Sequence, residues 1–126
     1  MASINEINTT ADCSFDVNNF VDNLLDQEVH FQVLKMKESF FVWIGSAAAK
    51  MEGLAVAMTT NIESDPSSAS LFGENVDILS TALAKKLAKA TKKQVFVSYN
   101  LPCDQQMLSL VEKRVHDEMK QHPEWF

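Results

Sequence analysis

The residue types that most often bind metals are few in this chain, and their spacing does not favour a metal site. Histidine occurs at His30, His116 and His122. His116 and His122 lie six residues apart, whereas residues that share one face of a helix are three or four apart. We therefore expect one histidine on a strand face and two solvated histidines on a helix, and no metal centre.

Nucleophilic chemistry is also weakly supported. Ser98 is not part of a GxSxG motif. A catalytic pairing of Ser98 with His116 or Asp117 would require these side chains to lie close together, which the sequence alone does not indicate. Cys103 lies just ahead of an expected helix, whose dipole could stabilise a thiolate, but no base is identified beside it. Cys13 and Cys103 form no CxxC pair, which favours two free thiols in a reducing compartment.

Glycine spacing and charge disfavour the binding of nucleotides and nucleic acids. Gly45, Gly53 and Gly73 are too far apart for a phosphate-binding loop or a dinucleotide fingerprint. The formal net charge of −6 and the pI of about 4.9 oppose a general nucleic-acid binder, which normally displays a basic field. The sequence therefore predicts a protein that is not an enzyme and carries no cofactor.

Any functional surface must be positioned by a run of strands followed by helices. The pattern predicts strands within 14–25, 29–36, 40–45, 54–60 and 94–101, a short edge strand at 70–72, and helices over 78–91 and 104–121. Asp104 is the expected N-cap of the second helix. This order predicts an α+β fold, in which a two-layer antiparallel β-sheet of about five to six strands carries two main helices on one face.

The length of 126 residues corresponds to one domain. Residues 1–13 are polar and are expected to form a disordered tail, which leaves 14–126 as a single domain. The amino terminus lacks a basic start followed by an apolar run, and no stretch approaches the roughly 18 apolar residues of a membrane span. We expect a protein that binds no membrane and lies in the cytoplasm, with the nucleus as a second location.

The best strands are apolar on both faces. No polar side chain occurs from Phe40 to Ile44 or from Leu54 to Met58, although a solvated antiparallel sheet normally alternates apolar and polar residues. Two helices on one face leave the other face without a cover, so we predict that this second face is used for dimerisation. The expected contact residues are Trp43, Leu54, Val56 and Val97. Which alternate set faces the helices stays open, because a one-residue error in register exchanges the two faces.

Lysines form the strongest charge feature. Lys85, Lys86 and Lys89 lie in the expected helix 78–91, and Lys92 and Lys93 follow it. One interpretation is a solvated helix face and end. The other is an electrostatic patch that steers an acidic partner surface, and both stay open at this point.

Six segments of the chain, in the same order and spacing, resemble the proteasome assembly chaperone 4 family. They are VHF at 29–31, FFVWIG at 40–45, LAVAM at 54–58, LAKKLAKATKKQ at 83–94, QVFVSYNL at 94–101 and VEKRVHDEMKQHPEWF at 111–126. The resemblance covers about 15–126. The chain departs from the family in its longer polar amino terminus and in the segments at 46–53 and 67–77.

The resemblance implies a non-catalytic chaperone that forms a heterodimer with a proteasome assembly chaperone 3-like subunit. The pair would promote assembly of the α-ring of the 20S proteasome, associate with the α5 subunit, and be released before the particle matures. It also implies that two subunits bring their sheets together. The alternative is a generic dimeric scaffold or adaptor domain of similar α+β fold. A small hydrolase or transferase ranks below both, because no catalytic constellation supports it.

Overall fold

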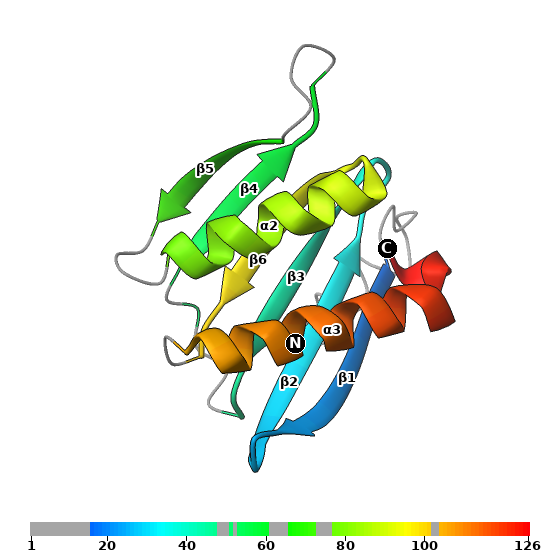
Figure 1. The fold of residues 1–126 in the computed structure, drawn as a ribbon. Helices are drawn as coiled ribbons and strands as arrows, with labels where there is room; N and C mark the ends of the chain where they lie inside the picture. The colour runs from blue at the N-terminus through cyan, green and yellow to red at the C-terminus, as the bar shows by residue number, and fades with distance from the viewer. Residues whose placement is uncertain (1–15, 48–50, 52, 61–65, 73–76, 102–103) are drawn as a thin grey trace, which may run out of the picture.

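The computed structural model describes residues 16–126 apart from 48–50, 52, 61–65, 73–76 and 102–103. This part of the chain forms one sheet with two helices across one of its faces (Figure 1). The expected α+β fold is therefore confirmed. The predicted tail at 1–13, Cys13 and Cys103 lie outside the described residues.

The sheet has six strands in the order β1-β2-β3-β6-β4-β5. The strands are β1 (Asp16–Leu24), β2 (Gln27–Lys35), β3 (Ser39–Gly45), β4 (Leu54–Met58), β5 (Ser67–Phe72) and β6 (Gln94–Tyr99). The helices are α2 (Asp77–Thr91) and α3 (Gln105–Gln121), and a 3-10 turn, η1 (Pro123–Trp125), follows α3. The predicted strands are all present, and the expected edge strand is longer than its predicted extent of 70–72.

One strand pair departs from the antiparallel expectation. β3 and β6 are parallel, whereas every other neighbouring pair is antiparallel. The reason is the crossover through α2. A helical connection returns the chain to the same end of the sheet, so β6 runs in the direction of β5 and enters between β3 and β4.

The core lies between the sheet and the two helices. Alternate residues of the central strands point into it, including Phe31, Phe40, Val42, Ile44, Val95, Val97 and Tyr99. The helices contribute leucines of α2 and valines of α3 to the same core, namely Leu79, Leu83, Leu87, Val111 and Val115. Their spacing of four residues places them on one side of each helix, which explains why each helix lies flat on the sheet.

Local sequence signals begin and end these elements. The Asp104 carboxylate accepts a hydrogen bond from the Gln106 backbone N–H at 2.9 Å, which confirms the predicted N-cap of α3. The turn between β1 and β2 consists of Leu25 and Asp26, with φ of 51° and 60°. Two positive φ angles are typical of a type I′ hairpin turn. Glycine and asparagine are the residues that normally indicate such a turn in a sequence, and neither occurs here.

The last residues fold back against the sheet. Phe126 is buried, and its ring meets the Phe40 ring edge to face with a centroid distance of 5.5 Å. Lys93 Nζ donates to the Phe126 carbonyl oxygen at 2.8 Å, and Lys35 Nζ donates to the Glu124 carbonyl oxygen at 2.8 Å. These contacts fix η1 beside the ends of β2 and β6.

Candidate functional site

The side of the sheet turned away from α2 and α3 is the outer face. In β3, Phe40, Val42 and Ile44 are buried in the core, while Phe41 and Trp43 alternate with them on the outer face and are half-buried. The other outer-face residues used below are Val21, His30, Gln32, Leu54, Val56, Met58 and Phe96. Among the described residues, no helix packs on this face (Figure 1).

The centre of the outer face is apolar, while β1 and β2 also place Asn19, His30 and Gln32 on it. Val21 and Met58 near its two sides are 52% and 47% exposed. Between them, the half-buried rings of Phe41 and Phe96 occupy paired positions of β3 and β6. A contiguous apolar surface of this kind on a soluble protein marks a site of association.

Trp43 lies over the backbone of its own strand. A Cβ atom at Gly45 would stand 2.6 Å from the Trp43 Cζ2 atom and 2.7 Å from Cη2. Only glycine at this position lets the indole occupy that place. Beside the ring is a groove of about 360 Å3, whose lining includes Val21, His30 and Gln32. The outer face therefore combines a large aromatic side chain with an adjacent hollow, the arrangement that protein interfaces use for their strongest contacts.

The predicted contact residues do not all lie together. Trp43, Leu54 and Val56 share the outer face, as expected. Val97 does not, because its exposed fraction is 0% and it belongs to the core under the helices. The prediction that Val97 shares a face with Trp43, Leu54 and Val56 is therefore wrong, because neighbouring residues of a strand point to opposite faces. In β6 it is Phe96 that points to the outer face.

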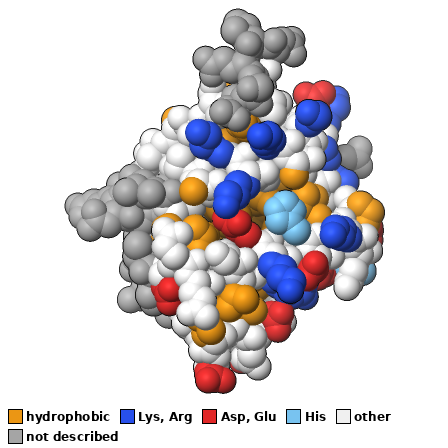
Figure 2. Space-filling model, in the orientation of Figure 1, with side chains coloured by type: hydrophobic (Ala, Val, Ile, Leu, Met, Phe, Trp, Pro, Cys, Tyr) orange, Lys and Arg blue, Asp and Glu red, His pale blue; other side chains and the backbone are white. Residues whose placement is uncertain are grey.

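The lysines of α2 form a second, separate surface. Lys85, Lys86 and Lys89 are exposed and lie in the helical layer, opposite the outer face. Figure 2 shows basic side chains gathered over α2 on this side of the molecule. Lys86 Nζ lies 3.0 Å from Glu112 Oε1, so it links α2 to α3. A partner on the outer face would not reach these lysines.

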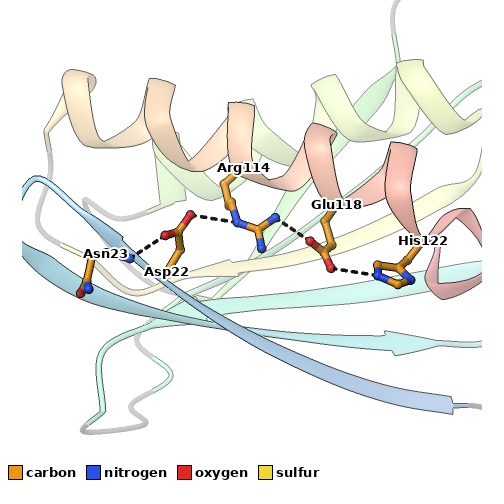
Figure 3. Close-up of polar contacts among 5 residues, drawn as sticks. All are labelled: Asp22, Asn23, Arg114, Glu118 and His122. Carbon is orange, nitrogen blue, oxygen red and sulfur yellow. Dashed lines mark hydrogen bonds and ion pairs between the residues drawn. The ribbon is translucent and has the colours of Figure 1, made fainter.

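A polar network fixes α3 to the edge strand β1 (Figure 3). Arg114 Nε contacts Asp22 Oδ2 at 2.9 Å, and its Nη1 contacts Glu118 Oε2 at 2.5 Å. The guanidinium also lies over the Phe20 ring, with Cζ 4.8 Å from the centroid. The spacing of four residues between Arg114 and Glu118 was a signal in the sequence, but nothing in the sequence placed Asp22 beside them.

His122 extends the network to the carboxyl-terminal turn. Its Nε2 is 3.9 Å from Glu118 Oε1, and its ring stacks on Trp125 with a centroid distance of 4.0 Å. The expectation of a solvated His122 is met only in part, because its side chain is 40% exposed but packs on Trp125. The pKa of Glu124 is lowered below its ordinary value, chiefly by a hydrogen bond from its own backbone and then by the His122 side chain.

We expect Arg114→Ala to destabilise the chain by about 2 kcal/mol, because it leaves the buried Glu118 carboxylate without its closest cation. This figure is below that for a fully buried pair, since the Arg114 side chain is 23% exposed. Chemical denaturation measures the change. Lys113→Ala is the matched control, because Lys113 is exposed on the same helix and should change stability by less than about 0.5 kcal/mol. Equal effects would show that the network contributes nothing.

The geometry does not assemble a catalytic site from the residues considered above. The Ser98 hydroxyl donates to the Gly53 carbonyl oxygen at 2.5 Å and accepts from Asn100 Nδ2 at 2.9 Å. His116 and Asp117 belong to α3, in the other layer. The described residues contain no cluster of three or more His, Cys, Asp or Glu residues suited to a metal ion. Over the same residues, no helix is both long and apolar enough to cross a membrane.

Comparison with known proteins gives a consistent result. The family model for proteasome assembly chaperone 4 matches residues 28–101. Proteasome assembly chaperone 4 of Mus musculus is 43% identical over 122 residues, which cover 96% of this chain and 98% of the mouse protein. The Homo sapiens protein of the same name is 46% identical over 111 residues, or 87% and 89% of the two chains.

A solved structure supports the fold. The chain is similar to a chain in the crystal structure of a chaperone complex for yeast 20S proteasome assembly, with a TM-score of 0.63. The match covers 83% of this chain and 96% of the yeast one at 10% sequence identity. At that identity the likeness shows the shared fold.

Proposed function

Since the chain belongs to the proteasome assembly chaperone 4 family, we propose that it works as one half of a heterodimer whose other half is a proteasome assembly chaperone 3-like subunit. Membership of the family indicates a role in proteasome assembly. We propose, in addition, the heterodimer, the surface through which it forms and the step of assembly at which it acts.

The observation that carries the proposal is the uncovered outer face. Trp43, Leu54 and Val56 present apolar side chains where the described residues offer no helix to bury them. A second sheet laid against this face would bury them, as the two sheets of a β-sandwich bury each other. The similar yeast chain comes from a chaperone complex, and that also supports a paired state.

The proposed mechanism is stoichiometric. The heterodimer binds an α subunit, with α5 as the expected one, and holds it in an orientation that accepts its neighbours in the α-ring. Later subunits displace the chaperone because they occupy overlapping surface, so differential affinity gives the cycle its direction without a nucleotide. The cytoplasm is the proposed location, with the nucleus as a second one.

The lysines of α2 have a proposed kinetic role. Replacing Lys85, Lys86 and Lys89 with glutamate should slow association with an acidic α-subunit surface, because opposed fields mainly change the association rate. The wild-type rate should fall with added salt, and the rate of the variant should be lower and less dependent on salt. Stopped-flow or surface-plasmon measurements at several ionic strengths check this. Since Lys86 pairs with Glu112, Lys85→Glu alone is a variant that leaves this ion pair intact. Equal rates at every ionic strength would leave the lysines as a solvated helix face.

The proposal as a whole is tested by co-purification from cells. A tagged chain should recover a chaperone of similar fold together with proteasome α subunits, identified by mass spectrometry. Expressed alone, the chain should self-associate, and co-expression with the partner should make it monodisperse. Recovery of an unrelated complex would support a generic scaffold instead. Turnover of a substrate by the purified monomer would support an enzyme.

A further inference from the structure

One end of the sheet carries an open hollow of about 880 Å3, here called the basic hollow. Its lining includes Met36, Lys37, Glu38, Met58, Lys92 and Lys93. The strand register explains how these distant segments meet. Ser39 pairs with Gln94 and Ala57 pairs with Val95, so the turn before β3, the turn before β6 and the end of β4 come together.

The basic hollow opposes the charge of the rest of the chain. Its described lining has three lysines against one glutamate, in a protein of net charge −6. Among the described residues, no ion pair engages Lys37 or Lys92. The Lys93 ammonium donates to the Phe126 carbonyl oxygen at 2.8 Å and is held in place there. Two cations are thus available to a ligand.

The backbone under these lysines is fixed. The Met36 N–H donates to the Ser39 carbonyl oxygen at 2.9 Å and closes the turn that carries Lys37. The Lys92 N–H donates to the Ala88 carbonyl oxygen at 2.7 Å, with Lys92 in a left-handed conformation at φ 59°. A preformed site loses less conformational entropy when it binds than a mobile one does.

The lining also has an apolar component. Met58 is 47% exposed at the end of β4, and Met36, which directly follows β2, also lines the hollow. Methionine side chains are flexible and adapt to different apolar partners. The site therefore offers cations and an adaptable apolar wall at once.

We propose that the basic hollow binds an acidic segment of a partner protein, with carboxylates beside Lys37 and Lys92 and an apolar side chain against Met58. This contact surface lies at the end of the sheet and shares Met58 with the edge of the outer face. An acidic peptide is favoured because two cations that the described residues leave unpaired, beside methionines, match carboxylates that alternate with leucine.

The test uses the full chain without its sheet-face partner, because Met58 also lies on the outer face, and a synthetic peptide that repeats the sequence Glu-Glu-Leu. Fluorescence anisotropy of the labelled peptide gives the dissociation constant at low and high salt. Methionine methyl groups labelled with carbon-13 report the location by NMR. The signals of Met36 and Met58 should shift and saturate, while those of Met107 and Met119 in the helical layer should not.

Lys37→Glu with Lys92→Glu should weaken peptide binding by at least about tenfold, because it places two acids against an acidic ligand. The matched control is Lys113→Glu with Lys120→Glu, which makes the same change of charge at two exposed positions of α3 and should weaken binding by less than about threefold. Lys37→Gln with Lys92→Gln removes the two positive charges without introducing negative ones. This milder variant is measured in place of the glutamate pair if that pair fails to fold, and it should also weaken peptide binding. The peptide with glutamine in place of glutamate should bind weakly.

Several outcomes would overturn the proposal. If the control pair weakens binding as much as the hollow pair does, the peptide responds only to overall charge. If it weakens binding more, the lysines of α3 are the site. Equal binding of the glutamine peptide would remove the carboxylates from the recognition. Pairing through the outer face is tested separately by co-purification.

Discussion

Replacing Trp43 with alanine is expected to weaken pairing through the outer face by about 30- to 1,000-fold, equivalent to about 2–4 kcal/mol. The indole is half-buried on a face that no described helix covers, so it is positioned to fill a site on a partner. The isolated chain should lose only about 1 kcal/mol, because the ring is not part of the core. Titration with the partner and thermal melting of the free chain separate the two effects.

Gly45→Ala provides a matched variant that keeps the tryptophan. The added methyl group would lie 2.6 Å from the Trp43 ring, so the indole must move. We expect a loss of affinity in the same direction as for Trp43→Ala, with little change in the melting of the free chain. If Trp43→Ala melts the free chain and leaves pairing intact, Trp43 is a packing residue. If neither property changes, the outer face is not the contact surface around Trp43.

An aspartate at Val97 and an aspartate at Val56 should have opposite consequences. Val97 has an exposed fraction of 0% and lies in the core, so Val97→Asp should cost on the order of 3–5 kcal/mol by burying an unpaired charge. That is a large part of the roughly 5–15 kcal/mol that stabilises a typical domain. Val56 lies half-buried on the outer face, and Val56→Asp should spare the free chain but reduce pairing by more than about 100-fold.

Circular dichroism during urea unfolding measures the first effect, and partner titration measures the second. Val97→Thr and Val56→Thr are the controls, because threonine is close to valine in size and carries no charge. Each should show the same pattern at smaller magnitude. A folded Val97→Asp variant that pairs poorly would mean that β6 presents the opposite set of residues, and the assignment of faces would fail.

The sequence alone determined the elements and the class of function. The apolar runs at 40–45 and 54–58 predicted β3 and β4 because polar residues are missing from them. Asp104 marked the start of α3 because a short carboxylate can accept the first backbone N–H bonds. The mismatch between strands apolar on both faces and two helices also predicted an uncovered face. Each of these signals is local in the chain.

Only the tertiary structure decided how those elements combine. β6 lies between β3 and β4 and pairs with β3 in parallel. In this register Val97 lies in the core and Phe96 lies on the outer face. The hairpin turn at Leu25 and Asp26 carries no glycine or asparagine signal and is held by the strands that it joins. Pairing over a long sequence separation depends on the packing of the whole sheet, and one residue of register reverses the two faces.

The same distinction applies to the charged residues. The spacing between Arg114 and Glu118 could be read from the sequence, but Asp22 joins them only because β1 pairs at the edge of the sheet beneath α3. Lys37 and Lys92 meet at one hollow because β3 and β6 begin side by side. A sequence lists which charges are present. Their fields act together only when the fold brings them within roughly 8 Å of each other, since salt at physiological ionic strength screens exposed charges that are further apart.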